Sequence, residues 1–99
     1  APVQVKILPI ADAHFEYASK VKEELEKEGI RVEVDYRNEK IGYKIREAQL
    51  EKVPYMAIVG DKEVEANAIG LRSRTEGDLG QISVADFENK IAEEIKNFK

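Results

Sequence analysis

Segments with the pattern of β-strands alternate with segments of helical periodicity along this chain. Strand patterns lie at residues 3–10, 31–36 and 56–59, and helical patterns fill the gaps between them. The run 3–10 becomes wholly apolar toward its end, which is typical of a strand buried on both faces. Such alternation restricts the chain to an α/β fold with a mostly parallel sheet, right-handed crossovers and helices on both faces.

The first helix is predicted between Asp12 and Gly29. Asp12 suits the N-cap position, and Gly29 suits the position just beyond the last helical turn. His14 lies one turn before the apolar stripe of this helix, and no serine or cysteine nucleophile can be paired with it from local sequence. We interpret both Asp12 and His14 as structural residues. The apolar stripe consists of Ala18, Val21 and Leu25.

A second helix is predicted from about residue 39 to residue 53, where Pro54 stops it. Tyr43 and Leu50 lie nearly opposite its core-facing stripe, so we expect this helix to be covered from two directions. The core-facing stripe consists of Ile41, Ile45 and Ala48.

The C-terminal third is predicted to contain a hairpin and a last helix. Residues 63–65 and 69–74 are expected to pair as short strands, and residues 75–80 are expected to form a loop. Ser83 and Asp86, three residues apart, resemble a capping box that opens the last helix. One strand of the hairpin must be antiparallel, which makes the sheet mixed.

Composition limits the classes of protein to which the chain can belong. Its 99 residues, 42% hydrophobic and 36% charged, predict one globular domain, residues 1–99. The absence of cysteine and the single histidine argue against a disulfide framework or a metal site. No apolar run approaches the roughly 20 residues that span a bilayer, and no signal peptide opens the chain. We therefore expect a cytoplasmic protein without a membrane or metal partner.

No self-contained active site is visible in the sequence. Residues 8–13, after the first strand, carry no phosphate-binding glycine pattern. Glu63 and Glu65 form a carboxylate pair, but on an exposed hairpin they would be too solvated for acid–base catalysis. We therefore do not expect this chain alone to be an enzyme.

A basic block at the start of the second helix points to binding instead. Between residues 36 and 46 four cations stand against the single anion Glu39, a local charge of +3 in a chain whose net charge is −4. The overall acidity argues against a generic nucleic-acid binder, and no DNA partner is expected, whereas the block favours an anionic partner. A solvated helix face of mixed charge is the alternative. The four cations are Arg37, Lys40, Lys44 and Arg46.

Several polar residues outside this block suit the recognition of unstacked bases. Arg72 and Arg74 are two apart on a predicted strand, so both should project from one face. Arginine, asparagine and glutamate can pair with base edges, which makes Arg72, Asn38 and Glu63 candidates. The alternatives are a surface salt bridge from the arginines to Glu63 or Glu65, and a helix-capping role for Asn38.

Five motifs are spread along the chain. They are RNEKIGYKIR at 37–46, VPYM at 53–56, VGDKEVE at 59–65, RSR at 72–74 and GDLG at 77–80. Together they resemble one family, the C-terminal anticodon-binding domain of bacterial-type class II threonyl-tRNA synthetases. The resemblance runs nearly end to end from the opening APVQV, with the motifs in matching order and spacing.

The resemblance implies a three-layer α/β/α fold with a five-stranded mixed sheet, and threonine tRNA as the partner. It implies that the G and U at the second and third anticodon positions are read by Asn38, Glu63 and Arg72. Contacts to the RNA backbone and loop are expected from Arg37, Lys40, Arg46 and Arg74.

The resemblance also implies that aminoacylation, with its ATP and catalytic zinc, belongs to a catalytic domain that this chain lacks. We expect no cofactor here and a monomeric isolated domain. Residues 65–70 and 75–76 are less basic than this family leads us to expect, which weakens the case for loop–phosphate contacts. An accessory or scaffold domain that does not bind RNA is the alternative. Whether the sequence is an excised domain, a paralogue or an engineered chain stays open.

Overall fold

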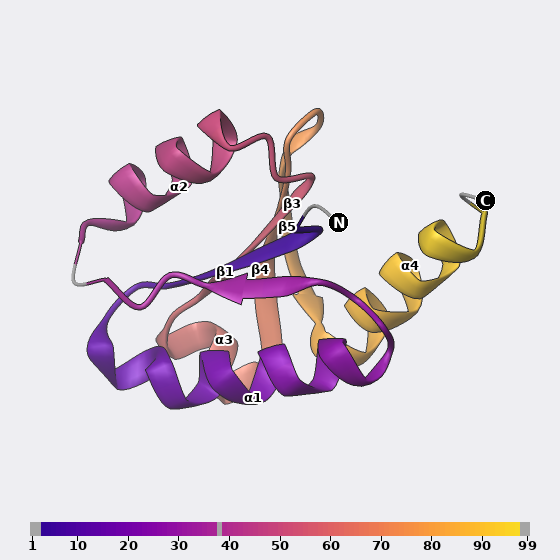
Figure 1. The fold of residues 1–99 in the computed structure, drawn as a ribbon. Coiled ribbons are helices and arrows are strands. Elements are labelled where there is room, and N and C mark those ends of the chain that lie inside the picture. Colours follow the sequence, from indigo (N-terminus) through magenta and orange to yellow (C-terminus); the bar gives the residue numbers. More distant parts are fainter. Residues whose placement is uncertain (1–2, 38, 98–99) are drawn as a thin grey trace.

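The computed structural model describes residues 3–37 and 39–97 and contains a five-stranded sheet flanked by helices (Figure 1). A short 3₁₀ turn, η1 (Asp12–His14), precedes the first α-helix. The elements follow in the order β1 (Val5–Pro9), α1 (Phe15–Lys27), β2 (Val32–Val34), α2 (Ile41–Leu50), β3 (Tyr55–Val59), α3 (Asp61–Ala66), β4 (Ala68–Ser73), β5 (Gly77–Ser83) and α4 (Val84–Asn97).

The strands lie in the order β2-β1-β3-β4-β5. β1 pairs in parallel with β2 and with β3, whereas β3–β4 and β4–β5 are antiparallel. The mixed, mostly parallel sheet is therefore confirmed: β4 is the one antiparallel strand, and the other four strands run in the same direction. The two parallel pairs carry helical crossovers, as parallel neighbours require.

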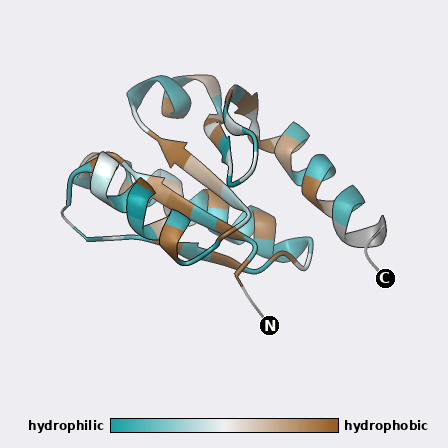
Figure 2. Cartoon of the chain, turned by 90° about the horizontal axis from the view of Figure 1, so that it is seen from above, coloured by the Kyte–Doolittle hydropathy of each residue, from teal (hydrophilic) through white to brown (hydrophobic). Residues whose placement is uncertain are grey.

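The two faces of the sheet are covered unequally. One face packs against α1 and α4 through a large apolar core that includes Val5, Ile7, Leu25, Phe87 and Ile91. On the other face, α2 covers a much smaller cluster. In Figure 2 the strands between the helices are largely hydrophobic, whereas the helices alternate hydrophobic and hydrophilic residues. The smaller cluster consists of Leu8, Ala48 and Met56, with Ile41, Ile45 and Ile58 against it.

This arrangement leaves one part of the sheet uncovered. The apolar contacts of α2 are made with β1 and β3, and residues 77–81 of β5 are exposed. β4 and β5 therefore present an open face beside α2, on the side of the sheet opposite α1 and α4. We call the α2 side of β4 and β5 the open face.

The structure corrects two predicted elements in the C-terminal half. Residues 63–65 are not a strand but lie in α3, because the Glu63 carboxylate accepts a hydrogen bond from the Gly60 N–H and caps the helix at 2.9 Å. Residues 77–80 are not a loop but begin β5, the true partner of β4. Gly77 and Gly80 both have positive φ, and a β-bulge lies beside them. These features hide the alternation by which a strand is recognised from sequence.

The first helix also begins differently from the prediction. Asp12 is not its N-cap: η1 follows Ala11, whose N–H is accepted by the Nδ1 of His14 at 3.1 Å. His14 is buried and structural, as predicted. Gly29, at φ +80°, ends α1 as expected, and its N–H reaches the Glu26 carbonyl oxygen at 3.0 Å.

The second helix is shorter than predicted. It ends because Lys52 adopts a left-handed φ of +62°, and the Val53 N–H then turns back to the Ala48 carbonyl oxygen at 3.3 Å. The prediction that α2 would be covered from two directions is wrong, since Tyr43 is 46% and Leu50 75% exposed.

The capping role of Ser83 is confirmed by the hydrogen bond from the Asp86 N–H to its hydroxyl at 3.1 Å. No helix in the described residues has the length and apolar character needed to cross a membrane.

Candidate nucleic-acid interface

Arg72 lies on the open face. In the antiparallel sheet it stands directly opposite Met56 on β3 and Asp78 on β5, and directly paired residues share a face. Met56 packs in the cluster beneath α2, which identifies this face as the α2 side. The side chain of Arg72 therefore leaves β4 on the side of the sheet that the helices do not cover.

Glu63 reaches the same face from α3. Its Oε1 accepts the hydrogen bond of the Gly60 N–H, which fixes the carboxylate. Its Oε2 lies 4.0 Å from the point that a Cβ on Gly70 would occupy, over the strand that carries Arg72. Because Gly70 and Arg72 are two residues apart on β4, their Cβ directions point to one face. The fold thus brings together two of the three predicted base-reading residues.

One hydrogen-bond donor of the Arg72 side chain has no acceptor in the described residues. This donor is the Nε, which is buried. The alternative of a salt bridge to Glu63 or Glu65 is not found, since no ion pair of Arg72 or Arg74 occurs in residues 3–37 and 39–97. A buried donor without an acceptor costs about 1–3 kcal/mol, and such a cost is commonly retained where a site needs it.

Arg74 differs from its predicted setting. β4 ends at Ser73, so Arg74 begins the turn to β5 and does not continue the strand beside Arg72. Its N–H donates to the Pro54 carbonyl oxygen at 2.9 Å, which fixes its backbone, and its side chain is exposed. It therefore stands at the end of the open face, without the shared direction that strand geometry would give.

Asn38 lies outside the described residues, so its predicted place beside Glu63 and Arg72 stays a prediction. Lys40 and Arg46 are both exposed, and neither forms an ion pair in the described part of the chain. Lys40 occupies the N-cap position of α2. These two cations are available to an anionic partner.

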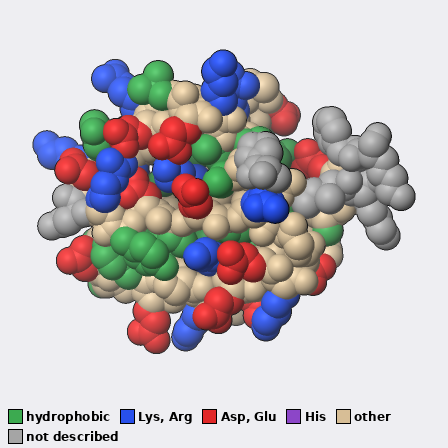
Figure 3. Space-filling view, viewed as in Figure 1, with side chains coloured by type: hydrophobic (Ala, Val, Ile, Leu, Met, Phe, Trp, Pro, Cys, Tyr) green, Lys and Arg blue, Asp and Glu red, His purple; other side chains and the backbone are tan. Residues whose placement is uncertain are grey.

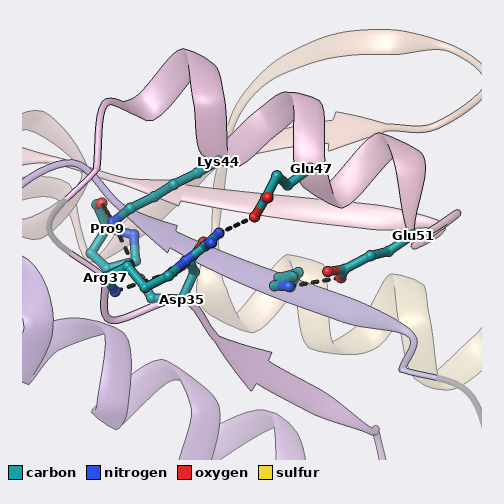
Figure 4. A network of polar contacts seen from close by, with 7 residues as sticks. Pro9, Asp35, Arg37, Lys44, Glu47 and Glu51 are labelled. Carbon is teal, nitrogen blue, oxygen red and sulfur yellow. Dashed lines mark hydrogen bonds and ion pairs between the residues drawn. The ribbon is translucent and has the colours of Figure 1, made fainter.

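Arg37, by contrast, is engaged within the protein. Its Nε and Nη2 donate to Oδ1 and Oδ2 of Asp35 at 2.9 and 2.8 Å, and Nη2 also contacts Glu47 (Figure 4). These hydrogen bonds hold the pKa values of the Asp35 and Glu47 carboxyl groups below their usual range. The bidentate fork holds Arg37 on Asp35 just after β2, and the contact with Glu47 ties this segment to α2. Arg37 is thus chiefly a structural residue, although about half of its side chain is exposed.

Lys44 is the second cation of the basic block that is engaged within the protein. Its side chain is 1% exposed, and its Nζ donates to the carbonyl oxygens of Pro9 at 2.9 Å and Asp35 at 3.2 Å (Figure 4). The ammonium also lies 5.9 Å from the centre of the Phe15 ring. Burial lowers the pKa of Lys44. This lysine joins α2 to the ends of β1 and β2 and cannot meet a phosphate.

The predicted basic patch is therefore smaller than its sequence charge. With Lys44 buried and Arg37 paired, Lys40 and Arg46 remain as its free cations. Figure 3 shows acidic and basic side chains interspersed over one face of the molecule. The sequence held a signal for the buried lysine: Lys44 lies three residues after Ile41 and four before Ala48, on the core-facing stripe.

The described residues contain no group of three or more side chains suited to hold a metal ion. His14, the only histidine in the sequence, has both ring nitrogens in use, since Nδ1 accepts from Ala11 and Nε2 lies 2.7 Å from an Asp61 oxygen. It joins η1 to the first turn of α3, the helix that carries Glu63.

Comparisons with known proteins agree on one family of relatives. A family model described as "Anticodon binding domain" matches residues 4–94. The threonine–tRNA ligase of Acetivibrio thermocellus is 61% identical over 97 residues, and that of Clostridium botulinum (strain Hall) is 63% identical over 97 residues. Each alignment covers 98% of this chain but 15% of the relative, so the chain spans a small part of these curated proteins.

A solved structure gives the same result for the fold. The RNA-binding domain of threonyl-tRNA synthetase from Cryptosporidium parvum Iowa II is similar at a TM-score of 0.87 and 32% sequence identity. The match covers 94% of this chain and 24% of that one. The three-layer architecture and the sequence resemblance noted above therefore agree with an independent structural comparison.

Proposed function

Because the chain belongs to the family of anticodon-binding domains, we propose that its open face binds the anticodon loop of a tRNA. The observation that carries this proposal is the convergence of Glu63 and Arg72 on one uncovered face of the sheet. Loop bases that leave their stack can lie against such a face and pair through their Watson–Crick edges. Glu63 accepts from base N–H groups, and Arg72 donates to base oxygens or nitrogens.

We further propose that the partner is threonine tRNA and that G and U at its second and third anticodon positions are read. Support comes from the relatives at 61% and 63% identity, which are threonine–tRNA ligases. Asn38 completes the set of base-reading residues in this proposal. The exposed cations Lys40, Arg46 and Arg74 contact the RNA backbone without distinguishing bases.

The larger protein in this proposal is a threonine–tRNA ligase. The chain spans 15% of such relatives, and the reaction with ATP and any catalytic zinc belong to the remainder. This domain supplies recognition, so that only a tRNA with the matching loop is held for aminoacylation. An acidic chain with few free cations is expected to bind weakly alone, with a dissociation constant on the order of micromolar or poorer.

Titration of anticodon stem-loops that differ in a single base tests the proposal. We expect the threonine loop to bind most tightly, and replacement of its second or third base to weaken binding by about 1–3 kcal/mol. The variant Arg72→Gln should lose this preference, whereas Arg31→Gln should keep it, because Arg31 is an exposed arginine just before β2. Equal affinity of the native chain for all loops would reject base reading and favour the scaffold alternative.

A further inference from the structure

One polar side chain on the open face has no assigned role, although it stands next to Glu63. Gln81 lies on β5 directly opposite Gly70, so the two residues share a face of the sheet. Its neighbour Ile82 packs against the core beneath α1 and α4, which places Gln81 on the opposite, open side. Gln81 is exposed, and no hydrogen bond within the described residues holds its amide.

The position of β4 that lies between Gln81 and Glu63 is Gly70, which has no side chain. The nearest atoms to a Cβ there would belong to Ile58 and Glu63, at 3.5–4.0 Å, which is ordinary contact. Its φ is not in the left-handed region, so its backbone conformation does not require glycine. A glycine inside a strand weakens the strand and often marks a place where a ligand approaches closely. The carboxylate and the amide thus flank a half-buried stretch of backbone that carries no side chain.

We propose that Gln81 is a further specificity-determining residue, which together with Glu63 reads a guanine placed over Gly70. The Watson–Crick edge of guanine presents one acceptor, O6, beside two donors, the N1–H and the N2 amine. The free Oε2 of Glu63 accepts from these donors, and the Gln81 amide donates to O6. Adenine reverses this pattern, because its N1 is an acceptor that faces the carboxylate unfavourably.

This inference rests on the proposed anticodon function and assigns it a new contact. The amide can turn about its last torsion to present either its NH₂ or its oxygen. Gln81 alone would therefore tolerate both purines, whereas the acceptor-only carboxylate of Glu63 selects guanine. The Gln81 contact then increases the preference for guanine over adenine that Glu63 provides.

The test uses the complete chain and stem-loops carrying guanine or 2-aminopurine at the second anticodon position. 2-Aminopurine keeps the N2 amine but lacks both O6 and the N1 proton, so it removes the Gln81 contact and one of the two donors to Glu63, and its binding is compared only between the native chain and the variant. We expect Gln81→Ala to weaken binding of the guanine loop by about three- to tenfold, the effect of one lost hydrogen bond. Binding of the 2-aminopurine loop should be equal for the native chain and the variant, because no O6 is present. Gln81→Glu should weaken the guanine loop further, since a carboxylate repels O6.

Gln49→Ala serves as the matched control, because Gln49 is an exposed glutamine on α2. It should bind both loops as the native chain does, and thermal unfolding should show all variants to be folded. If the native chain distinguishes the loops but Gln81→Ala binds the guanine loop with native affinity, the Gln81 contact is wrong and the proposed function stands. If the native chain itself does not distinguish loops of different sequence, both proposals fail together.

Discussion

At the scale of single residues, the molecule uses its charged side chains in two ways. Lys44 and Arg37 hold α2 against the ends of β1 and β2. Lys40, which is close to them in sequence, is exposed. A count of charges cannot separate these roles, because burial decides whether a cation meets a carbonyl group or a phosphate. Helical position can separate them, since Lys44 falls on the buried stripe.

Replacing Lys44 with methionine should reduce the free energy of unfolding by about 1–3 kcal/mol, because it leaves the carbonyl groups of Pro9 and Asp35 buried without a donor. The loss of stability stays moderate because methionine removes the cost of burying the charged Lys44 ammonium group. Lys40→Met, an exposed change at the start of the same helix, should alter stability by less than about 0.5 kcal/mol. Urea unfolding measures both. Equal stability of the two variants would contradict the structural role of Lys44.

The Asp35–Arg37 pair should make stability depend on acidity. Hydrogen bonds from Arg37 lower the pKa of the Asp35 carboxyl group in the folded state. A lowered carboxyl pKa contributes stability above the unfolded value, which is about 3.9, and that contribution is lost as the pH falls through the folded value. Asp35→Asn should therefore be less stable than the native chain at pH 7, by roughly 1–3 kcal/mol.

The difference between Asp35→Asn and the native chain should shrink as the pH falls below about 4. Chemical unfolding at a series of pH values measures this. Asp12→Asn is the matched control, because Asp12 is exposed and lies outside this network. If the difference in free energy of unfolding between Asp35→Asn and the native chain stayed constant down to pH 2, the charge of the Asp35 carboxylate would contribute nothing to stability.

At the scale of elements, α4 carries an unfavourable contact toward α1. The Glu88 carboxyl group has a buried oxygen without a partner among the described residues. Burial, followed by the nearby Glu24 and Glu28, raises its pKa. A raised carboxyl pKa means that the ionised form is penalised in the folded state, so the penalty is present at neutral pH and is relieved as the pH falls.

Glu88→Gln should therefore raise the free energy of unfolding at pH 7 by a few tenths of a kcal/mol, the usual scale for a like-charge pair between surface side chains. The gain should shrink as the pH falls toward 4, where the native carboxyl also becomes neutral. Glu93→Gln, at an exposed position of the same helix, should show no comparable gain. Thermal unfolding measures both variants, and a loss of stability in Glu88→Gln would refute the repulsive contact.

The elements also show where sequence reasoning was sufficient. The strands β1 and β3, the stripe of α1 and the ends marked by Gly29 and Ser83 follow local patterns, and the structure confirms them. α3 and β5 were missed because a side-chain cap and a bulge override propensity there. The side of the sheet on which Arg72 lies depended on strand pairing, which no local pattern encodes.

At the scale of the whole molecule, the sheet separates two surfaces of different character. One side is closed by α1 and α4, whose outward residues are rich in glutamate, including Glu23, Glu26 and Glu93. The other side is only partly closed by α2, which leaves β4 and β5 open. Under the proposed function, the first surface repels an RNA loop and the second offers it hydrogen-bonding groups, so the charge distribution favours one orientation of docking.

The most direct test of this account is a map of backbone amide chemical shifts during titration with the threonine anticodon stem-loop. We predict saturable shifts confined to α3, β4, β5 and the start of α2, with the largest near Glu63, Arg72 and Gln81. The amides of α1 and the later turns of α4 should not move. Shifts centred on α1 and α4, or none at RNA concentrations well above micromolar, would contradict the central claim that the open face of the sheet binds the loop.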